Sequence, residues 1–244
     1  MLPELHRLLM ALGPVYSLGK AKEFIYEKNV LNKKTFDNRN AVWHRLNHRY
    51  FKVQIPWIVS SLNEVATSGI TSSNFISLSY LYYVLRDRLV HDFVITQIWE
   101  LWCSGVTNIS NSDFSKFINE NRLENVELTK WRETTLNRLA RNNLSALRDF
   151  GLLAGTAIKH IQRPTITPET VYHLLAILWA EGKRGRAILE AEDWKLFLWN
   201  DADTTHSLVH LSQLGWIKFE RGGQTVILDM IRTPESMGKK VDDQ

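Results

Sequence analysis

Apolar side chains recur every three or four residues along nearly the whole 244-residue chain, and this spacing limits the available folds more than any other feature. A helix turns by about 100° per residue, so such spacing places the apolar side chains on one face. The chain is therefore expected to be mostly α-helical. Helices are predicted over residues 3–12, 18–28, 35–52, 56–66, 77–90, 93–103, 113–121, 129–150, 168–181, 186–198 and 204–214.

Two segments depart from the helical pattern and are predicted to form β-hairpins. Residues 151–163 follow a long predicted helix, and residues 216–230 hold two β-rich runs around Gly222 and Gly223. A Gly-Gly pair supplies the positive φ angles that tight hairpin turns need. Helices followed by a hairpin are typical of a winged helix, in which the hairpin forms the wing. Thr167 before Pro168 indicates a helix start, and Gly182 a helix end.

The predicted fold class is mostly α, with helix-turn-helix and winged-helix units joined by a helical middle, and with small β-hairpin wings. Weak boundaries near residues 54–56 and 164–168 give three parts. Residues 1–55 are predicted to form an N-terminal helix-turn-helix domain. Residues 56–165 form a helical middle that ends in a basic recognition-like helix and a wing, and residues 166–244 form a C-terminal winged-helix-like domain.

Positive charge is concentrated in two blocks, although the net charge is only +4. Residues 1–52 hold ten Lys or Arg against four Asp or Glu, and residues 130–163 hold seven against two. The remaining blocks are net acidic. Such basic blocks suit a polyanion, because each neutralised phosphate releases counterions. Two ordinary solvated helices explain the same charge equally well, so charge alone leaves both interpretations open.

The predicted helix 129–150 separates an apolar face from a basic face. The side chains expected on the buried face are Leu136, Leu139, Ala140, Asn143, Leu147 and Phe150. Those on the opposite face, at spacings of three and four, are Thr134, Arg138, Arg141, Ser145 and Arg148. A helix of this kind fits the major groove, where Arg binds guanine or phosphate. The alternative is an ordinary surface helix, which usually mixes charge signs. Lys130 at its start, and Lys159 and Arg163 in the wing, complete this predicted DNA-binding set.

The predicted helix 35–52 also separates an apolar face from a basic face. Its expected buried side chains are Phe36, Val42, Trp43, Leu46 and Tyr50, and its predicted DNA-binding side chains are Asn38, Arg45, His48 and Lys52. With helix 18–28 and the turn 29–34 it forms a predicted helix-turn-helix in which Lys33 and Lys34 bind phosphate. The turn lacks Gly and is long for this motif. Helix 204–214 contains no Lys or Arg, so a protein-interaction or structural role is expected there.

The sequence lacks the signatures of common catalytic sites. Residues 182–186 lack the spacing and the Ser or Thr of a phosphate loop, and no nucleophile elbow is present. His206 and His210, four apart near Asp203, form only a weak metal motif, and Asp201 or Asp203 is interpreted as a helix N-cap. Cys103 is expected to be a buried, inert thiol. We expect no enzymatic activity, cofactor, metal or small-molecule substrate.

The cytoplasm is the expected compartment. One cysteine cannot form an internal disulfide, and residues 1–10 lack the apolar core of a signal peptide. The uncharged run 65–85 is long enough to span a bilayer but is rich in Ser and Thr, so it is interpreted as a loop and a helix start. No membrane partner is expected.

Residues 130–153, KWRETTLNRLARNNLSALRDFGLL, continue through Gly155, Lys159 and Ile161 to Pro164. This stretch resembles the characteristic segment of the BrxA family of bacterial BREX phage-resistance systems. Residues 181–198, with the sequence EDWKLF, and more loosely residues 27–50 are similar to the same family. The resemblance implies a small, helical and winged-helix DNA-binding protein encoded beside a methyltransferase, an ATPase and other defence components. It supplies no catalytic residue.

The leading expectation is a non-enzymatic accessory protein of a BREX system that binds double-stranded DNA through both basic helices, with other BREX proteins as further partners. Two alternatives stay open. One is a scaffold whose helical middle and acidic C-terminal part join other subunits. The other is a helical RNA-binding regulator. Competition between duplex DNA and structured RNA for the protein distinguishes this alternative from DNA binding, because an α-helix fits the B-form major groove but not the A-form one.

Overall fold

The computed structural model describes residues 1–13, 16–52, 55–121, 131–223 and 225–233. Backbone contacts divide the chain into two compact units. Unit 1 comprises residues 1–86, 166–191 and 199–244, and unit 2 comprises residues 87–165 and 192–198. The first and third parts predicted from the sequence thus contribute mainly to one unit. The three-domain division itself stays a prediction.

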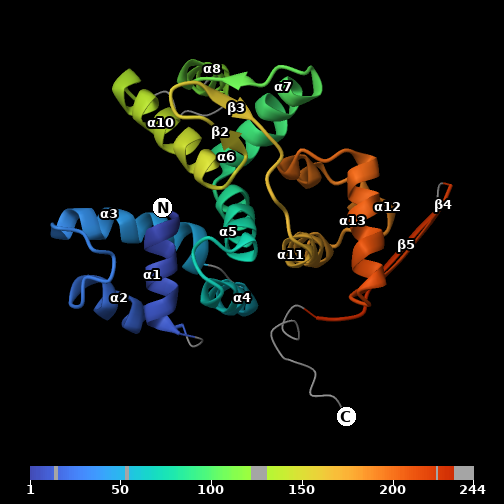
Figure 1. The fold of residues 1–244 in the computed structure, drawn as a ribbon, viewed down its shortest axis with the longest axis horizontal. Helices are drawn as coiled ribbons and strands as arrows, with labels where there is room; N and C mark the ends of the chain where they lie inside the picture. Colours follow the sequence, from blue (N-terminus) through green and yellow to red (C-terminus); the bar gives the residue numbers. More distant parts are fainter. Residues whose placement is uncertain (14–15, 53–54, 122–130, 224, 234–244) are drawn as a thin grey trace, which may run out of the picture. The chain divides into compact units, whose positions relative to one another are not determined.

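Unit 1 is built mainly of helices, with one hairpin near its C-terminal end (Figure 1). Its elements are α1 (Leu2–Leu12), α2 (Leu18–Tyr26), α3 (Phe36–Leu46), the π-helical turn η1 (Asn47–Phe51), α4 (Pro56–Thr67), α5 (Ser73–Arg86), α11 (Pro168–Ala180), α12 (Arg186–Leu189), α13 (Asp201–Gln213), β4 (Ile217–Gly222) and β5 (Thr225–Met230). Helix α1 packs on α2 and α4, and α11 packs on α5 and α13. Because neighbours contact it on several sides, α5 buries Tyr80, Tyr82 and Tyr83.

Unit 2 combines helices with a small sheet. Its elements are α6 (Arg88–Phe93), the π-helical turn η2 (Val94–Ile98), α7 (Trp99–Cys103), β1 (Asn108–Ile109), α8 (Asn111–Asn121), α10 (Glu133–Asp149), β2 (Leu153–Ala154), β3 (Lys159–Ile161) and the 3-10 helix η3 (Glu192–Phe197). The antiparallel sheet has the order β1-β3-β2, with Leu153 opposite Ile161 and Asn108 opposite His160. Phe93 packs against Phe114 with ring centroids 4.6 Å apart.

The structure confirms a mostly helical chain with small antiparallel hairpins. Both predicted hairpins are present, as β2 with β3 and as β4 with β5. Thr167 is the N-cap of α11 and Pro168 its first residue, while Gly182 after its end has a φ of 88°. No helix in the described part of the chain combines the length and apolarity needed to cross a bilayer.

Several local predictions were wrong. Residues 186–198 do not form one helix, because η3 packs on η2 within unit 2 whereas α12 packs within unit 1. The helix predicted to reach residue 90 ends at Arg86, since Asp87 caps the next helix by accepting a hydrogen bond from the Val90 amide. Strand β1 was not predicted, as two residues carry no periodic signal. Cys103 is exposed rather than buried.

Candidate nucleic-acid interface

Helix α10 carries the longer of the two basic faces. Its first turn holds Glu133, which suits the positive end of a helix dipole. The apolar side contacts α8 and β2, which fixes the rotation of the helix about its axis. The prediction of a buried face is confirmed for Leu136, Ala140, Asn143, Leu147 and Phe150, while Leu139 is half-buried.

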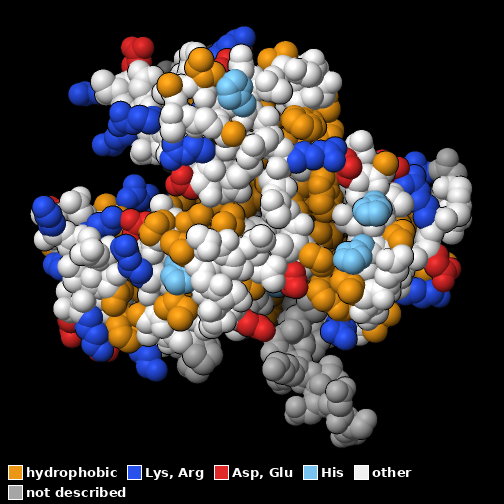
Figure 2. Space-filling model, viewed as in Figure 1, with side chains coloured by type: hydrophobic (Ala, Val, Ile, Leu, Met, Phe, Trp, Pro, Cys, Tyr) orange, Lys and Arg blue, Asp and Glu red, His pale blue; other side chains and the backbone are white. Residues whose placement is uncertain are grey.

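Two arginines dominate the exposed side of α10. Arg138 and Arg141 are both exposed, together with Thr134. Within the residues that the structure describes, neither arginine forms an ion pair or a side-chain hydrogen bond. They border a hollow of about 600 Å³ beside the start of α8, lined also by Asn111 and Asn137. Lys and Arg side chains gather over α10 in Figure 2.

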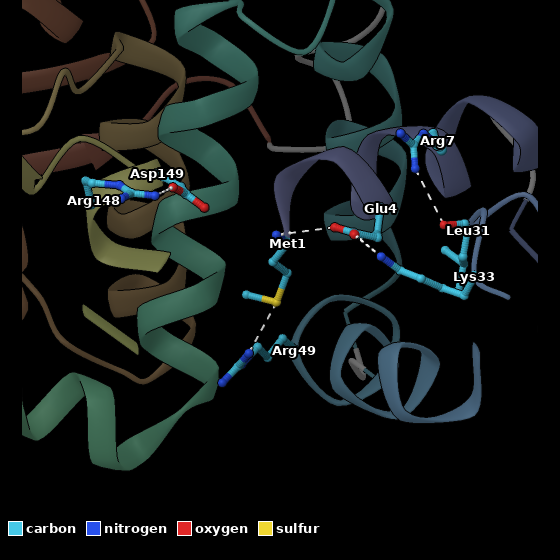
Figure 3. Close-up of polar contacts among 8 residues, drawn as sticks. All are labelled: Met1, Glu4, Arg7, Leu31, Lys33, Arg49, Arg148 and Asp149. Carbon is cyan, nitrogen blue, oxygen red and sulfur yellow. Dashed lines mark hydrogen bonds and ion pairs between the residues drawn. The ribbon is translucent and has the colours of Figure 1, made fainter. Parts of the chain in front are cut away.

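The basic face of α10 differs between its C-terminal end and its start. Arg148 is half-buried and forms an ion pair of 3.0 Å with Asp149 (Figure 3). It also donates to the Ser145 hydroxyl at 3.4 Å, and Ser145 is itself half-buried. The charge of Arg148 is thus partly balanced by Asp149. Lys130, the predicted contact at the other end, lies outside the described residues.

The hairpin β2–β3 follows α10 directly. Lys159 is half-buried and its Nζ atom donates to the Thr156 carbonyl oxygen at 3.2 Å, within the same hairpin. His160 is exposed on β3. Arg163 is exposed and its guanidinium carbon lies 5.9 Å from the ring centroid of Trp102. A cation stacked on an aromatic face keeps its charge, so the hairpin remains basic.

The second basic face lies on α3 and η1 in unit 1. All four predicted contact residues are exposed, namely Asn38, Arg45, His48 and Lys52. Trp43, Leu46 and Tyr50 are buried as predicted, and Val42 is half-buried. The expectation for Phe36 was wrong, because its ring is 57% exposed and stacks on Tyr26 at the helix start. The end of the face is anchored by Arg86, which donates to the Lys52 carbonyl oxygen at 2.8 Å.

The turn before α3 shows why its two lysines differ. Lys34 is exposed, whereas the Nζ atom of Lys33 lies 2.7 Å from the Glu4 carboxylate of α1 (Figure 3). Lys33 therefore helps to hold the turn in place, while its role as a phosphate contact stays a prediction. Asn29 and Asn32 have φ angles of 48° and 52°. Asn tolerates this left-handed conformation, so the two asparagines allow the turn to form without Gly. The sequence interpretation noted the missing Gly but did not recognise these asparagines as turn residues.

In the described C-terminal part of unit 1, helix α13 contains no Lys or Arg. Helix α13 begins after Asn200, so the expected N-cap at Asp201 or Asp203 was wrong. Asp203 instead accepts from the Asn200 amide at 3.0 Å, and Asn200 accepts from the Asp203 amide at 2.9 Å. The hydroxyl-rich helix exposes His206 and His210. Within the described residues, no three His, Cys, Asp or Glu side chains gather as metal ligands would.

A protein-family model matches this chain over residues 1–178, and its description is BrxA. The match includes α1 to α8, α10 with the β2–β3 hairpin, and most of α11. The chain belongs to the BrxA family. This confirms the resemblance found in the sequence and points to a component of a BREX phage-resistance system. None of the curated proteins matches the chain. Both basic faces lie within the part that the BrxA model matches, while α12, α13 and the β4–β5 hairpin follow it.

Proposed function

We propose that this BrxA-family protein binds double-stranded DNA and acts by binding rather than by catalysis. The observation that carries the proposal is the pair Arg138 and Arg141, exposed on one side of α10 without a carboxylate partner in the described part of the chain. Guanidinium groups that are not neutralised inside the protein favour phosphate oxygens, and in the major groove they bind guanine through two hydrogen bonds.

The order of elements in unit 2 supports α10 as the recognition helix. A helix (α6 to α7) is followed by β1, α8, α10 and the β2–β3 hairpin, and β1 pairs with β3. Among the described elements, this order is similar to that of a winged helix, in which the last helix enters the major groove and the hairpin is the wing. The packing of α10 on α8 resembles the way a recognition helix is supported by the preceding helix.

We propose a second, weaker contact through α3. Helices α2 and α3, joined by the turn 27–35, have the order of a helix-turn-helix. Arg45 is exposed on α3, His48 is exposed on η1, and Lys52 is exposed just after η1. The exposed Lys34 lies just before that helix, where its charge suits the DNA backbone. Unit 1 and unit 2 thus each present one basic helix face.

A role without catalysis fits what the two faces contain. The side chains proposed as contacts are cations, amides and hydroxyls, which bind phosphates and base edges. We propose that the chemistry of the defence system resides in other BREX proteins, that these proteins are partners, and that the protein works in the cytoplasm.

Binding of the purified protein to a fluorescent duplex, measured over a range of salt concentrations, tests the proposal. If about six to eight phosphates are neutralised, the logarithm of affinity falls against the logarithm of salt with a slope of about −0.9 per phosphate. A flat salt response, or no binding at low salt, would overturn it. Preference for structured RNA over duplex DNA would favour the RNA-binding alternative.

One observation favours a scaffold role for the C-terminal part of unit 1. Helix α13 has no Lys or Arg, and Val209, Leu214 and Ile227 are each about 40% exposed. Exposed apolar side chains suit a protein partner better than a phosphate backbone. Co-purification of another BREX protein with the parent chain, lost when Val209 and Leu214 are both changed to Ser, would support this second role.

A further inference from the structure

The tip of the β2–β3 hairpin presents an apolar side chain to solvent. Ile158 is 64% exposed, the largest exposed fraction among the large apolar side chains of the described residues. Its neighbours in the loop, Gly155, Thr156 and Ala157, are exposed as well. Single exposed apolar residues are common and need no explanation by themselves. Ile158 differs because of how its loop is held and what surrounds it.

The loop that carries Ile158 is tightly closed. Gly155 has a φ of 84°, and a side chain at this position would collide with the Ile158 carbonyl oxygen. Glycine is the residue that permits both the positive φ and the close approach. Lys159 braces the same loop by donating to the Thr156 carbonyl oxygen at 3.2 Å. The position of Ile158 at the tip is therefore set by the backbone of the loop.

The segment of the chain that contains the loop is basic. Between Asp149 and Glu169 the sequence contains no acidic residue, while Lys159, His160 and Arg163 lie on or just after β3. An apolar tip on a basic hairpin is the combination found in proteins that enter the minor groove, where cations follow the phosphates and an apolar wedge slides between two base pairs.

We infer that Ile158 inserts into the minor groove of bound DNA and partly unstacks a base step. The inference rests on the proposed DNA binding and assigns a separate role to the hairpin. The step it opens is expected to be flexible, such as a TA step, because such steps cost least to kink.

The inference is tested with a duplex that carries the fluorescent base 2-aminopurine beside a central TA step. Stacking quenches this base, so binding of the parent protein should raise its fluorescence. Ile158→Ala should bind about tenfold more weakly, because the truncated side chain buries fewer methyl groups. It should also fail to raise the fluorescence at saturating protein. Circular dichroism should be unchanged, since the side chain is exposed.

Two further variants test whether the effect is specific to an apolar side chain at the tip of the hairpin. Ile231→Ala removes a side chain that is 61% exposed in unit 1, and it should leave both affinity and fluorescence as in the parent. Ile158→Lys adds a charge at the tip. If the tip only touched phosphates, this variant would bind more tightly with the parental fluorescence, whereas a wedge predicts that the fluorescence rise is lost.

The failure of this inference differs from the failure of the proposed function. Salt-dependent binding of the parent without any change in 2-aminopurine fluorescence, or a parental fluorescence rise with Ile158→Ala, would overturn the wedge and leave DNA binding intact. A parent protein that binds no duplex would overturn both.

Discussion

The Nζ atom of Lys33 lies 2.7 Å from Oε1 of Glu4, so an ion pair largely shielded from water ties the turn before α3 to α1. Burial by itself raises the pKa of Glu4. The hydrogen bond from Lys33 and the nearby Met1 ammonium outweigh burial and lower that pKa to about 2. Because the folded pKa lies below the unfolded one, the stabilisation is complete above pH 4.5 and is lost as the pH falls towards 2.

Glu4→Gln should therefore lower the free energy of unfolding by about 1 to 2 kcal/mol at pH 7, because it replaces a charge-assisted hydrogen bond by a neutral one. The difference from the parent should narrow as the pH falls below 4.5. Denaturant unfolding at several pH values measures both. Glu64→Gln, at an exposed position of α4, serves as the control and should have little effect. Equal losses in the two variants would contradict this account of Lys33.

His91 links two helical segments of unit 2. Its Nε2 atom lies 3.2 Å from the Asp193 carboxylate of η3, and its Nδ1 atom lies 3.2 Å from that of Asp92. The hydrogen bond with Asp193 raises the pKa of His91, against burial, which lowers it. A raised folded pKa means that the stabilisation is complete below the unfolded value of about 6.5 and is lost as the pH rises through the folded value.

His91→Gln is accordingly expected to destabilise the protein more at pH 6 than at pH 9. The quantity to measure is the difference in melting temperature between variant and parent, because other groups also titrate over this range. The exposed His206 provides a matched control, and His206→Gln should change the melting temperature little. A His91→Gln difference that stays constant from pH 6 to pH 9 would contradict the assignment.

The pKa of His173 in α11 is shifted in the opposite direction from that of His91. Burial lowers its pKa to about 3, and the Tyr82 hydroxyl of α5 lies 2.7 Å from its Nδ1 atom. The folded state holds this ring neutral while the unfolded chain takes up a proton, so stability falls as the pH drops below about 6.5. His173→Phe should weaken this acid dependence, which urea unfolding at pH 5 and pH 7 would show. An unchanged dependence would refute it.

Tyr82→Phe removes the partner of that ring nitrogen and should cost about 1 to 3 kcal/mol, because the nitrogen is left buried without its hydrogen bond. Tyr26→Phe is the matched control. Its hydroxyl donates to Asn40 at 2.8 Å in a half-buried position, where water replaces the lost partner. Urea unfolding of both variants at pH 7 should show the larger loss for Tyr82→Phe.

The faces of the basic helices could be predicted because burial of one side fixes the other. Once Leu136, Ala140 and Leu147 pack inward, the 3.6-residue repeat places Arg138 and Arg141 outside. The same logic predicted the exposure of Arg45. The role of Lys33 could not be predicted in this way, because its partner lies 29 positions earlier in the sequence and the pair depends on how α1 packs.

The segment after α11 shows a second case in which apolar periodicity does not predict the structure. Residues 186–198 have helical spacing, yet Trp194 and Phe197 are buried in η3, within unit 2. Packing there overrides the local preference for one continuous helix, and Leu198 takes a φ of 56° where the 3-10 helix ends. Local spacing holds no information about which unit a short segment joins.

The two basic faces should contribute unequally to DNA binding. Arg45→Glu with Lys52→Glu is expected to weaken duplex binding less than the equivalent double change on α10, because the α10 arginines lie beside a basic hairpin. Fluorescence anisotropy at one fixed salt concentration compares the two double variants. A larger loss on α3 would assign the main contact to unit 1.

The most direct test of DNA binding through α10 is the affinity of the double variant Arg138→Glu with Arg141→Glu for a duplex. Both side chains are exposed and Glu is as good a helix former as Arg, so the fold should be kept. Arg88→Glu with Lys218→Glu changes the net charge equally at exposed positions outside the proposed contacts. Each lost contact is worth about 1 to 3 kcal/mol, so the α10 variant should bind at least about 100-fold more weakly while the control binds nearly as the parent does. An α10 variant that is folded by circular dichroism and binds duplex DNA like the parent would contradict it.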